Sequence, residues 1–461
     1  NNPGWFIPWQ HLIQFVAPDF FGNPTTLNYW GVWNYGELVG YVGIIPLILA
    51  LFSLFFRRDK KTFFFGTLLF LSLIFSLPTF FAKVPYLLKI PFLDTAQPTR
   101  LLFMITFSLA ILSTLGLDYL VRIKRKIIIF YPLVFVTIIF GFLWIFIPEE
   151  NSLVVKSNLR LPTLLLAAAT IIFSFLVLFP KKNKLSTSIY IIIIGVTAFD
   201  LFRFGWKFLP FTQKTYLFPS TSTISFLQKN VGTFRIMSED SRILPPNFSA
   251  IYKLQSIDGY DPLYLLRYGE LIAASERNKA NIDSPFGFNR IITPHRFGSK
   301  IVDLLGVKFI LSLSDLDFPK LKKVFQEGET RIYENINVVP RVFFVSKILS
   351  AEDKKDAIRK MFDTSFNQDT LAIVEDADKE VLDKKKLVIG KAIIINYSEN
   401  KIVIQTENSG TGFLVITDSF YPTWKVKIDS RKENIYRTNY NFRGVTVPAG
   451  KHRVEFYNSL F

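Results

Sequence analysis

The chain has 461 residues, half of them hydrophobic and 49 of them Phe, yet it carries a formal net charge of +17. A single soluble domain of this length would be large for one core, so at least two units are expected. The absence of cysteine excludes a disulfide framework, a thiol nucleophile and a thiolate metal site.

The basic charge of the first half is concentrated in three short clusters, at residues 57–61, 122–126 and 181–184. Each cluster lies between two apolar runs, as expected for cytoplasmic loops, because Lys and Arg are retained on the cytoplasmic side during membrane insertion. Nucleic-acid binding would instead need a basic face on a soluble domain, so we expect no nucleic-acid partner.

The apolar runs predict an α-helical transmembrane bundle over residues 1–206, each run being near the ~20 residues that span a bilayer. The six predicted spans are Leu38–Phe56, Thr62–Phe81, Leu101–Val121, Ile127–Ile147, Leu161–Phe179 and Ser186–Trp206. With the basic clusters on the cytoplasmic side, the loops at 1–37, 78–100 and 148–160 lie outside. Everything after residue 206 is then also extracytoplasmic. A large extracytoplasmic half without a disulfide suits a bacterium, so we expect a multi-pass protein of a bacterial plasma membrane.

Two extracytoplasmic domains are predicted after the bundle. Helical and extended patterns alternate over residues 207–387, which indicates an α/β domain. The predicted elements are helices Ser222–Asn230, Gly298–Leu305 and Ala351–Phe362, and strands Thr233–Ser238, Val307–Leu313, Arg331–Glu334, Arg341–Ser346 and Thr370–Val374. The charged run at 376–386 indicates a linker or surface turn. Residues 388–461 alternate with period two between turn signals, which predicts a β-sandwich with Trp424 in its core.

No soluble-enzyme motif occurs in the chain: it lacks a glycine-rich phosphate loop, a Gly-x-Ser-x-Gly elbow and a His-Glu-x-x-His helix. The three histidines are dispersed, so no histidine metal site is predicted. The sequence leaves open whether a divalent cation takes part. We therefore expect any functional residues at the outer ends of the predicted helices.

Residues 15–43 combine aromatic rings and amides with the only two acids that precede the first basic cluster, Asp19 and Glu37. Together with Tyr35, these carboxylates could line a sugar pocket, because rings stack on sugar C–H faces while acids and amides bind hydroxyls. The alternative is an interfacial aromatic belt that only packs.

Charged residues near the predicted helix ends are further candidates. Arg100, at the outer start of the third span, could hold a lipid phosphate or could be a snorkelling anchor. Asp200 and Arg203 lie three residues apart near the outer end of the sixth span, which predicts an ion pair. Its role could be functional or purely structural. Asp118 is expected to pair with the Arg122 cluster at the cytoplasmic interface.

In the soluble half, Asp258, Tyr260, Asp261 and Arg267 bring carboxylates, a ring and a guanidinium within ten residues. This segment is a candidate substrate-binding loop. Asp-Gly and Asp-Pro are also ordinary turn formers, so a purely structural loop is the alternative.

Several of these stretches together resemble the YfhO family of bacterial multi-pass membrane proteins. The similarity lies in Ala17-Pro-Asp19-Phe-Phe-Gly22, Tyr41-Val-Gly-Ile-Ile-Pro46, Gly259-Tyr-Asp-Pro262 with Arg267-Tyr268, Leu305-Gly-Val-Lys-Phe309, Tyr421-Pro-Thr-Trp424, Asn441-Phe-Arg-Gly-Val445 and Val447-Pro-Ala-Gly-Lys451. The family usually has Pro-Gly-Trp and Asp-Gly where this chain has Pro422-Thr-Trp424 and Asp429-Ser430; both departures lie in predicted turns.

The resemblance implies an integral-membrane glycosyltransferase of the C-type fold. Such an enzyme moves a sugar from a polyprenyl-phosphate donor to a cell-envelope polymer, such as a teichoic acid, on the outer face of the membrane. In that fold the principal catalytic acid lies in the first outer loop, which we expect to precede Asn1, so Asp19 and Glu37 would assist. Arg100 and Arg203 are then candidates for the donor phosphate. The rival interpretation is a non-catalytic scaffold or binding protein for lipid-linked or cell-wall glycans; a transporter would need more polar residues within the spans.

Overall fold

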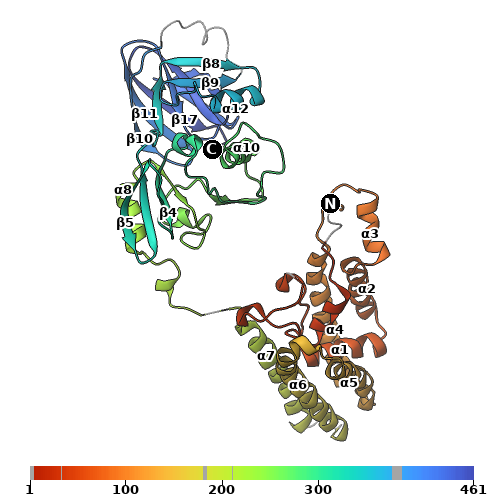
Figure 1. The fold of residues 1–461 in the computed structure, drawn as a ribbon. Helices are drawn as coiled ribbons and strands as arrows, with labels where there is room; N and C mark the ends of the chain where they lie inside the picture. The colour runs from red at the N-terminus through yellow and green to blue at the C-terminus, as the bar shows by residue number, and fades with distance from the viewer. Residues whose placement is uncertain (1–4, 33, 180–183, 210, 376–386, 461) are drawn as a thin grey trace. The chain divides into compact units, whose positions relative to one another are not determined.

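A computed structural model describes residues 5–460, apart from 33, 180–183, 210 and 376–386. The chain divides into two units, Asn1–Thr212 and Gln213–Phe461. Helices build the first unit and strands dominate the second (Figure 1). The third basic cluster and the charged run at 376–386 lie largely outside the described residues, so the structure does not address those two predictions.

Apolar helices form the first unit, as the hydropathy pattern predicts. They are α1 (Ile44–Phe56), α2 (Lys60–Ser76), α3 (Phe80–Leu87), α4 (Leu102–Arg122), α5 (Phe130–Ile145), α6 (Ser152–Leu178) and α7 (Lys184–Trp206). Within the described residues, α4 to α7 are long and apolar enough to cross a membrane, and α2 with α3 make a fifth candidate if this pair, bent by 61°, is one span. The structure thus supports four or five spans by length and composition, where the sequence predicted six.

Helix α1 accounts for part of this difference. It has 13 residues, which at 1.5 Å per residue is about 20 Å, short of the ~30 Å of bilayer hydrocarbon. The helix starts at Ile44 and not at Leu38 because Gly43 has a φ of +94°, outside the helical region. The backbone N–H of Ile44 then donates to the Asp200 carboxylate of α7 (3.2 Å), which satisfies a donor at the positive end of the α1 dipole.

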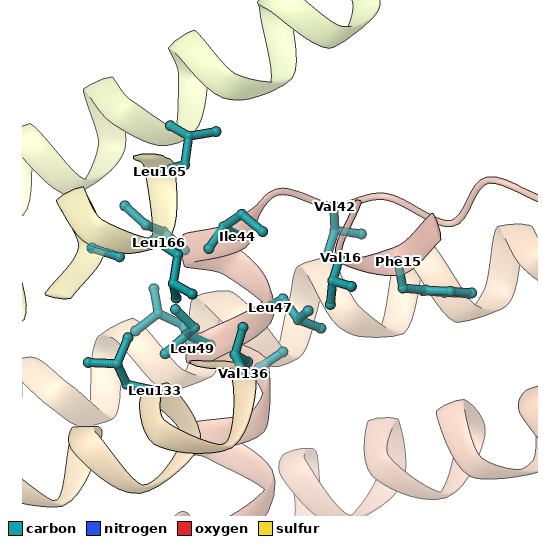
Figure 2. Close-up of a cluster of buried hydrophobic side chains, with 14 of the residues drawn as sticks. Phe15, Val16, Val42, Ile44, Leu47, Leu49, Leu133, Val136, Leu165 and Leu166 are labelled. Carbon is teal, nitrogen blue, oxygen red and sulfur yellow. The ribbon is translucent and has the colours of Figure 1, made fainter. Parts of the chain in front are cut away.

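The core of the helical unit surrounds α1. Every residue from Ile44 to Ala50 is buried, as expected for a helix that is apolar on all sides. Figure 2 shows side chains of α1 grouped with Leu133 and Val136 of α5 and with Leu165 and Leu166 of α6. The loop before α1 contributes Phe15, Val16 and Val42 to the same cluster, so this loop is anchored in the bundle core.

The first two basic turns lie at the same end of the bundle. Arg57, after α1, donates to the Leu115 carbonyl oxygen (2.7 Å) and to the Asp118 carboxylate (2.8 Å) near the end of α4. Asp118 also binds Arg122 (2.7 Å), which confirms the predicted pairing of Asp118 with its own basic cluster. These contacts agree with helices that alternate in direction.

The second unit begins with an α/β layer. Its mixed sheet has the order β1-β4-β6-β5, with β1 (Arg235–Ser238) parallel to β4 (Val307–Ser312), and with β5 (Leu321–Glu327) and β6 (Thr330–Asn335) antiparallel. Helix α8 (Ser222–Asn230) shares one apolar cluster with this sheet. Helices α10 (Leu266–Arg277) and α11 (Lys300–Leu304) share another.

Two further sheets follow. One has the order β10-β11-β17-β13-β14, and the other β7-β12-β16-β15-β9-β8. The strands are β7 (Val342–Val345), β8 (Lys347–Ala351), β9 (Leu371–Glu375), β10 (Lys391–Tyr397), β11 (Lys401–Asn408), β12 (Gly412–Ile416), β13 (Trp424–Ile428), β14 (Arg431–Glu433), β15 (Tyr436–Thr438), β16 (Phe442–Val447) and β17 (Gly450–Asn458). Both sheets contribute to one core, which includes Phe344, Ile404, Leu414 and Phe456. Since β7 to β9 precede residue 387, the sandwich extends beyond its predicted start, and helix α12 (Lys354–Phe362) connects β8 to β9.

Candidate functional site

The loop that contains Asp19 is held by a chain of hydrogen bonds that starts at a buried histidine. His11 lies in the 3-10 helix η1 (Trp9–Phe15), stacks on Phe21 with ring centroids 4.4 Å apart, and accepts the Val32 N–H at Nε2 (3.2 Å). Its Nδ1 must therefore donate to Gln14 Oε1 (2.6 Å). The Gln14 amide donates in turn to the Pro18 carbonyl oxygen (3.0 Å), next to Asp19. Burial lowers the pKa of His11, in agreement with a neutral ring.

Both carboxylate oxygens of Asp19 are occupied. Oδ1 accepts from the Tyr35 hydroxyl (2.8 Å) and from the Asn23 amide (2.7 Å), while Oδ2 forms a salt bridge with Lys207, just after α7. The side chain of Asp19 is 9% exposed and that of Lys207 is 24% exposed. Asp19 is therefore a buried ion-pair partner, and Lys207 would have to leave before Oδ2 could accept a proton from a substrate.

Aromatic rings cover this ion pair. Tyr35 stacks on Phe208, with ring centroids 5.5 Å apart, and meets Tyr29 edge-on at 5.3 Å. Burial, followed by the charge of Asp19, raises the pKa of the Tyr35 hydroxyl, so this hydroxyl stays protonated and donates. The carboxylate and rings predicted to line a pocket thus come together, as a packed cluster.

Glu37 and Arg100 form a second ionic group. Arg100 Nη2 lies 3.1 Å from Glu37 Oε1, and the Thr99 hydroxyl donates to Glu37 Oε2 (3.1 Å). The Arg100 side chain is 70% exposed. A guanidinium has five N–H donors, so Arg100 can bind an external anion while it keeps Glu37.

Arg100 borders an apolar cavity of about 710 Å³. The cavity lies between α2, α3 and the segment that leads to the 3-10 helix η4 (Pro98–Leu101), and it is lined by Leu71, Ser72, Phe75, Ala82, Pro85, Tyr86, Leu93, Ala96, Gln97, Pro98, Arg100 and Leu101. It exists because the chain bends between α2 and α3 at Leu77-Pro78-Thr79, where Thr79 caps α3 by accepting the Ala82 N–H (3.2 Å). Apolar walls with one cation suit a ligand that has an apolar tail and an anionic head.

Asp200 and Arg203 do not form the predicted ion pair within the described residues. Asp200 instead accepts from the Tyr41 hydroxyl (2.8 Å) as well as from Ile44 N–H, and it is buried. The Arg203 side chain is exposed. Asp200 therefore fixes α1 against α7, and Arg203 is free of this structural role.

The candidate residues of the second unit do not converge on one site. Arg267 forms a bidentate salt bridge with the buried Glu375 (2.8 Å for both bonds). Tyr260 and Asp261 are exposed, and Asp261 caps its own turn by accepting the Leu263 N–H (2.8 Å). Asp258 is partly buried, and burial raises its pKa to about 6. This geometry agrees with the structural-loop alternative.

Sequence reasoning missed Lys207, Asn23 and Asn158. Asn158 of α6 donates to the backbone oxygen of Asp19 (2.7 Å), so α6 and the residue that follows α7 both contact this loop. Lys207 carried a signal, as a cation directly after an apolar span, but nothing local identified its partner. Among the described residues, no group of three or more His, Asp or Glu side chains could hold a metal ion.

Comparisons with known proteins do not identify the chain. No protein-family model, curated protein or solved structure matches it.

Proposed function

We propose that this protein binds a polyprenyl-phosphate-linked sugar at the outer face of a bacterial membrane and transfers the sugar to a cell-envelope polymer. The observation that carries the proposal is the cavity between α2 and α3, which combines apolar walls with the exposed guanidinium of Arg100. A polyprenyl phosphate has the matching chemistry, a long apolar chain ending in a phosphate.

The surroundings of the cavity support a lipid ligand. Helix α3 exposes Phe80, Phe81 and Leu87, and a large exposed apolar face indicates contact with a membrane or partner. If the basic turns at 57–61 and 122–126 are cytoplasmic, the bend between α2 and α3 lies toward the outer face.

The proposed step is a displacement at the anomeric carbon. An acceptor hydroxyl oxygen forms a bond to that carbon, the bond from the carbon to the phosphate oxygen breaks, and polyprenyl phosphate leaves with the electron pair. Arg100 would hold the charge of the leaving phosphate. A base must take the hydroxyl proton; Glu37, which contacts Arg100, is the candidate that the sequence singles out.

One observation favours the non-catalytic alternative, in which the protein only binds lipid-linked or cell-wall glycans. The two outer-loop carboxylates that the sequence singles out are engaged: Glu37 binds both Arg100 and Thr99, and Asp19 is buried against Lys207. A binding protein needs no free base, whereas an enzyme that uses Glu37 or Asp19 needs one of these contacts to open.

The two functions separate in an assay that measures donor binding and sugar transfer on the same membranes. Arg100→Gln should weaken binding of the polyprenyl-phosphate sugar and lower transfer. Glu37→Gln should leave binding within about twofold and, if Glu37 is the base, lower transfer by about 10²–10⁴-fold. Lys83→Gln, an exposed cation of α3 that does not line the cavity, is the control. Binding without any transfer by the wild type would select the alternative, and unchanged binding by Arg100→Gln would reject both.

A further inference from the structure

A second cavity lies at the opposite end of the same helix pair, beside the first basic turn. It measures about 690 Å³ and is lined by residues from the end of α1 to the middle of α2, among them Arg58, Lys60, Phe63, Gly66 and Phe70. Cations lie at one end of the cavity and apolar residues follow along α2. None of these residues takes part in the proposed sugar transfer.

The charges at this turn do not balance locally. The backbone N–H of Thr62 and the Arg57 guanidinium hold the pKa of the Asp59 carboxyl at about 2, so Asp59 is charged, and it is neutralised by Arg57 at 2.6 Å. Arg58 and Lys60 are exposed, and no residue in the described part of the chain forms an ion pair with either. The cavity therefore carries two cations that are available to an external anion.

The apolar part of the cavity continues along the helix surface. Phe63 and Phe70 are 77% and 63% exposed, and they lie on one face of α2, since residues seven apart in a helix are close in angle. Between them, Gly66 has no side chain and packs closely against Leu54, which also lines the cavity: a Cβ at Gly66 would lie 2.9 Å from Leu54 Cδ2. A hydrocarbon chain can follow this groove with little side-chain volume in its way.

We propose that this cavity binds an anionic phospholipid of the membrane leaflet at the basic turns, with its phosphate between Arg58 and Lys60 and an acyl chain along Phe63 and Phe70. Basic pockets between transmembrane helices are suited to anionic headgroups on the cytoplasmic side. The second basic turn repeats the pattern, because Arg125 borders a smaller cavity of about 400 Å³ lined by Ile127, Ile128, Phe130, Tyr131 and Val134. The lipid would fix the α1–α2 turn whether or not the protein is an enzyme.

Native mass spectrometry of the purified chain in detergent tests this proposal with two lipids that have identical acyl chains, a phosphatidylglycerol and a phosphatidylcholine. We expect tighter binding of phosphatidylglycerol, and about fivefold weaker binding for each cation removed in Arg58→Gln and Lys60→Gln. Lys124→Gln, which removes an exposed cation that lines neither cavity, should change binding less than twofold.

A substitution at Gly66 tests the acyl-chain part of the proposal. Gly66→Leu should weaken binding of both lipids because the new side chain fills the path of the acyl chain, and circular dichroism shows whether α2 remains folded. If it does not fold, the Arg58→Gln and Lys60→Gln series decides. Equal binding of the two lipids, equal losses in Lys124→Gln, or full displacement of phosphatidylglycerol by inorganic phosphate alone would overturn the proposal.

Discussion

Replacing Asp19 and Lys207 singly and together tests whether this ion pair is structural. Asp19→Asn leaves the Lys207 ammonium beside a neutral amide, and Lys207→Met leaves the buried Asp19 carboxylate with only the neutral donors Asn23 and Tyr35. Breaking a buried pair costs about 3–5 kcal/mol. Because Lys207 is 24% exposed and can turn toward water, we reduce this to about 2–3 kcal/mol for each single variant.

The double variant Asp19→Asn/Lys207→Met should also lose only about 2–3 kcal/mol, since removing the second charge relieves the first. The coupling free energy is then about 2–3 kcal/mol, well above the ~0.5 kcal/mol expected for independent sites. The free energy of unfolding in detergent, followed by tryptophan fluorescence, measures it. If the losses of the two single variants add, the reasoning is wrong.

The same variants separate a positioning role from catalysis. If Asp19 only holds the loop, sugar transfer should follow stability, so the double variant should keep as much transfer as either single variant. A much larger loss of transfer in the two variants that carry Asp19→Asn than in Lys207→Met, at equal stability, would instead assign chemistry to Asp19.

Three further predictions concern packing and pH. A Cβ at Gly116 of α4 would lie 2.0 Å from the Leu49 backbone oxygen of α1, whereas nothing lies within 4 Å at Gly141 of α5; Gly116→Leu should therefore give aggregated protein in size-exclusion chromatography, and Gly141→Leu should not. Asp418→Asn should cost about 3–5 kcal/mol, because it leaves buried guanidiniums without their carboxylate, and should lower the unfolding temperature of the second unit by roughly 10 °C in a circular dichroism melt. Since the pKa of His11 is lowered, the unfolded state binds a proton more readily; stability should fall as the pH drops below about 6.5, and His11→Gln should lose this dependence in melts at pH 5 and pH 7.5.

Local signals in the sequence predicted much of the fold. Helix α8 occupies Ser222–Asn230 as predicted, because Thr221 caps it and Ile224 and Leu227 face the sheet. Strand β4 ends within one residue of its predicted end. Periodicity and capping depend only on residues that are close in the sequence, so these elements could be predicted from the sequence alone.

Features that depend on distant partners could not be predicted in this way. The run from Leu38 reads as one apolar span, but Gly43 and the contact of Asp200 with Ile44 place the start of α1 six residues later. The partner of Asp19 lies 188 residues away at Lys207. The cavity beside Arg100 depends on a bend whose angle no local pattern specifies.

Photo-cross-linking is the most direct test of the proposed donor site. A polyprenyl-phosphate sugar with a diazirine in the isoprene unit next to the phosphate is bound to the protein in nanodiscs, and the cross-linked peptides are identified by mass spectrometry. We predict cross-links within residues 71–101, reduced by Arg100→Gln and unchanged by Lys83→Gln. Cross-links that map outside this segment, or that are as strong in Arg100→Gln as in the wild type, would contradict a donor site between α2 and α3.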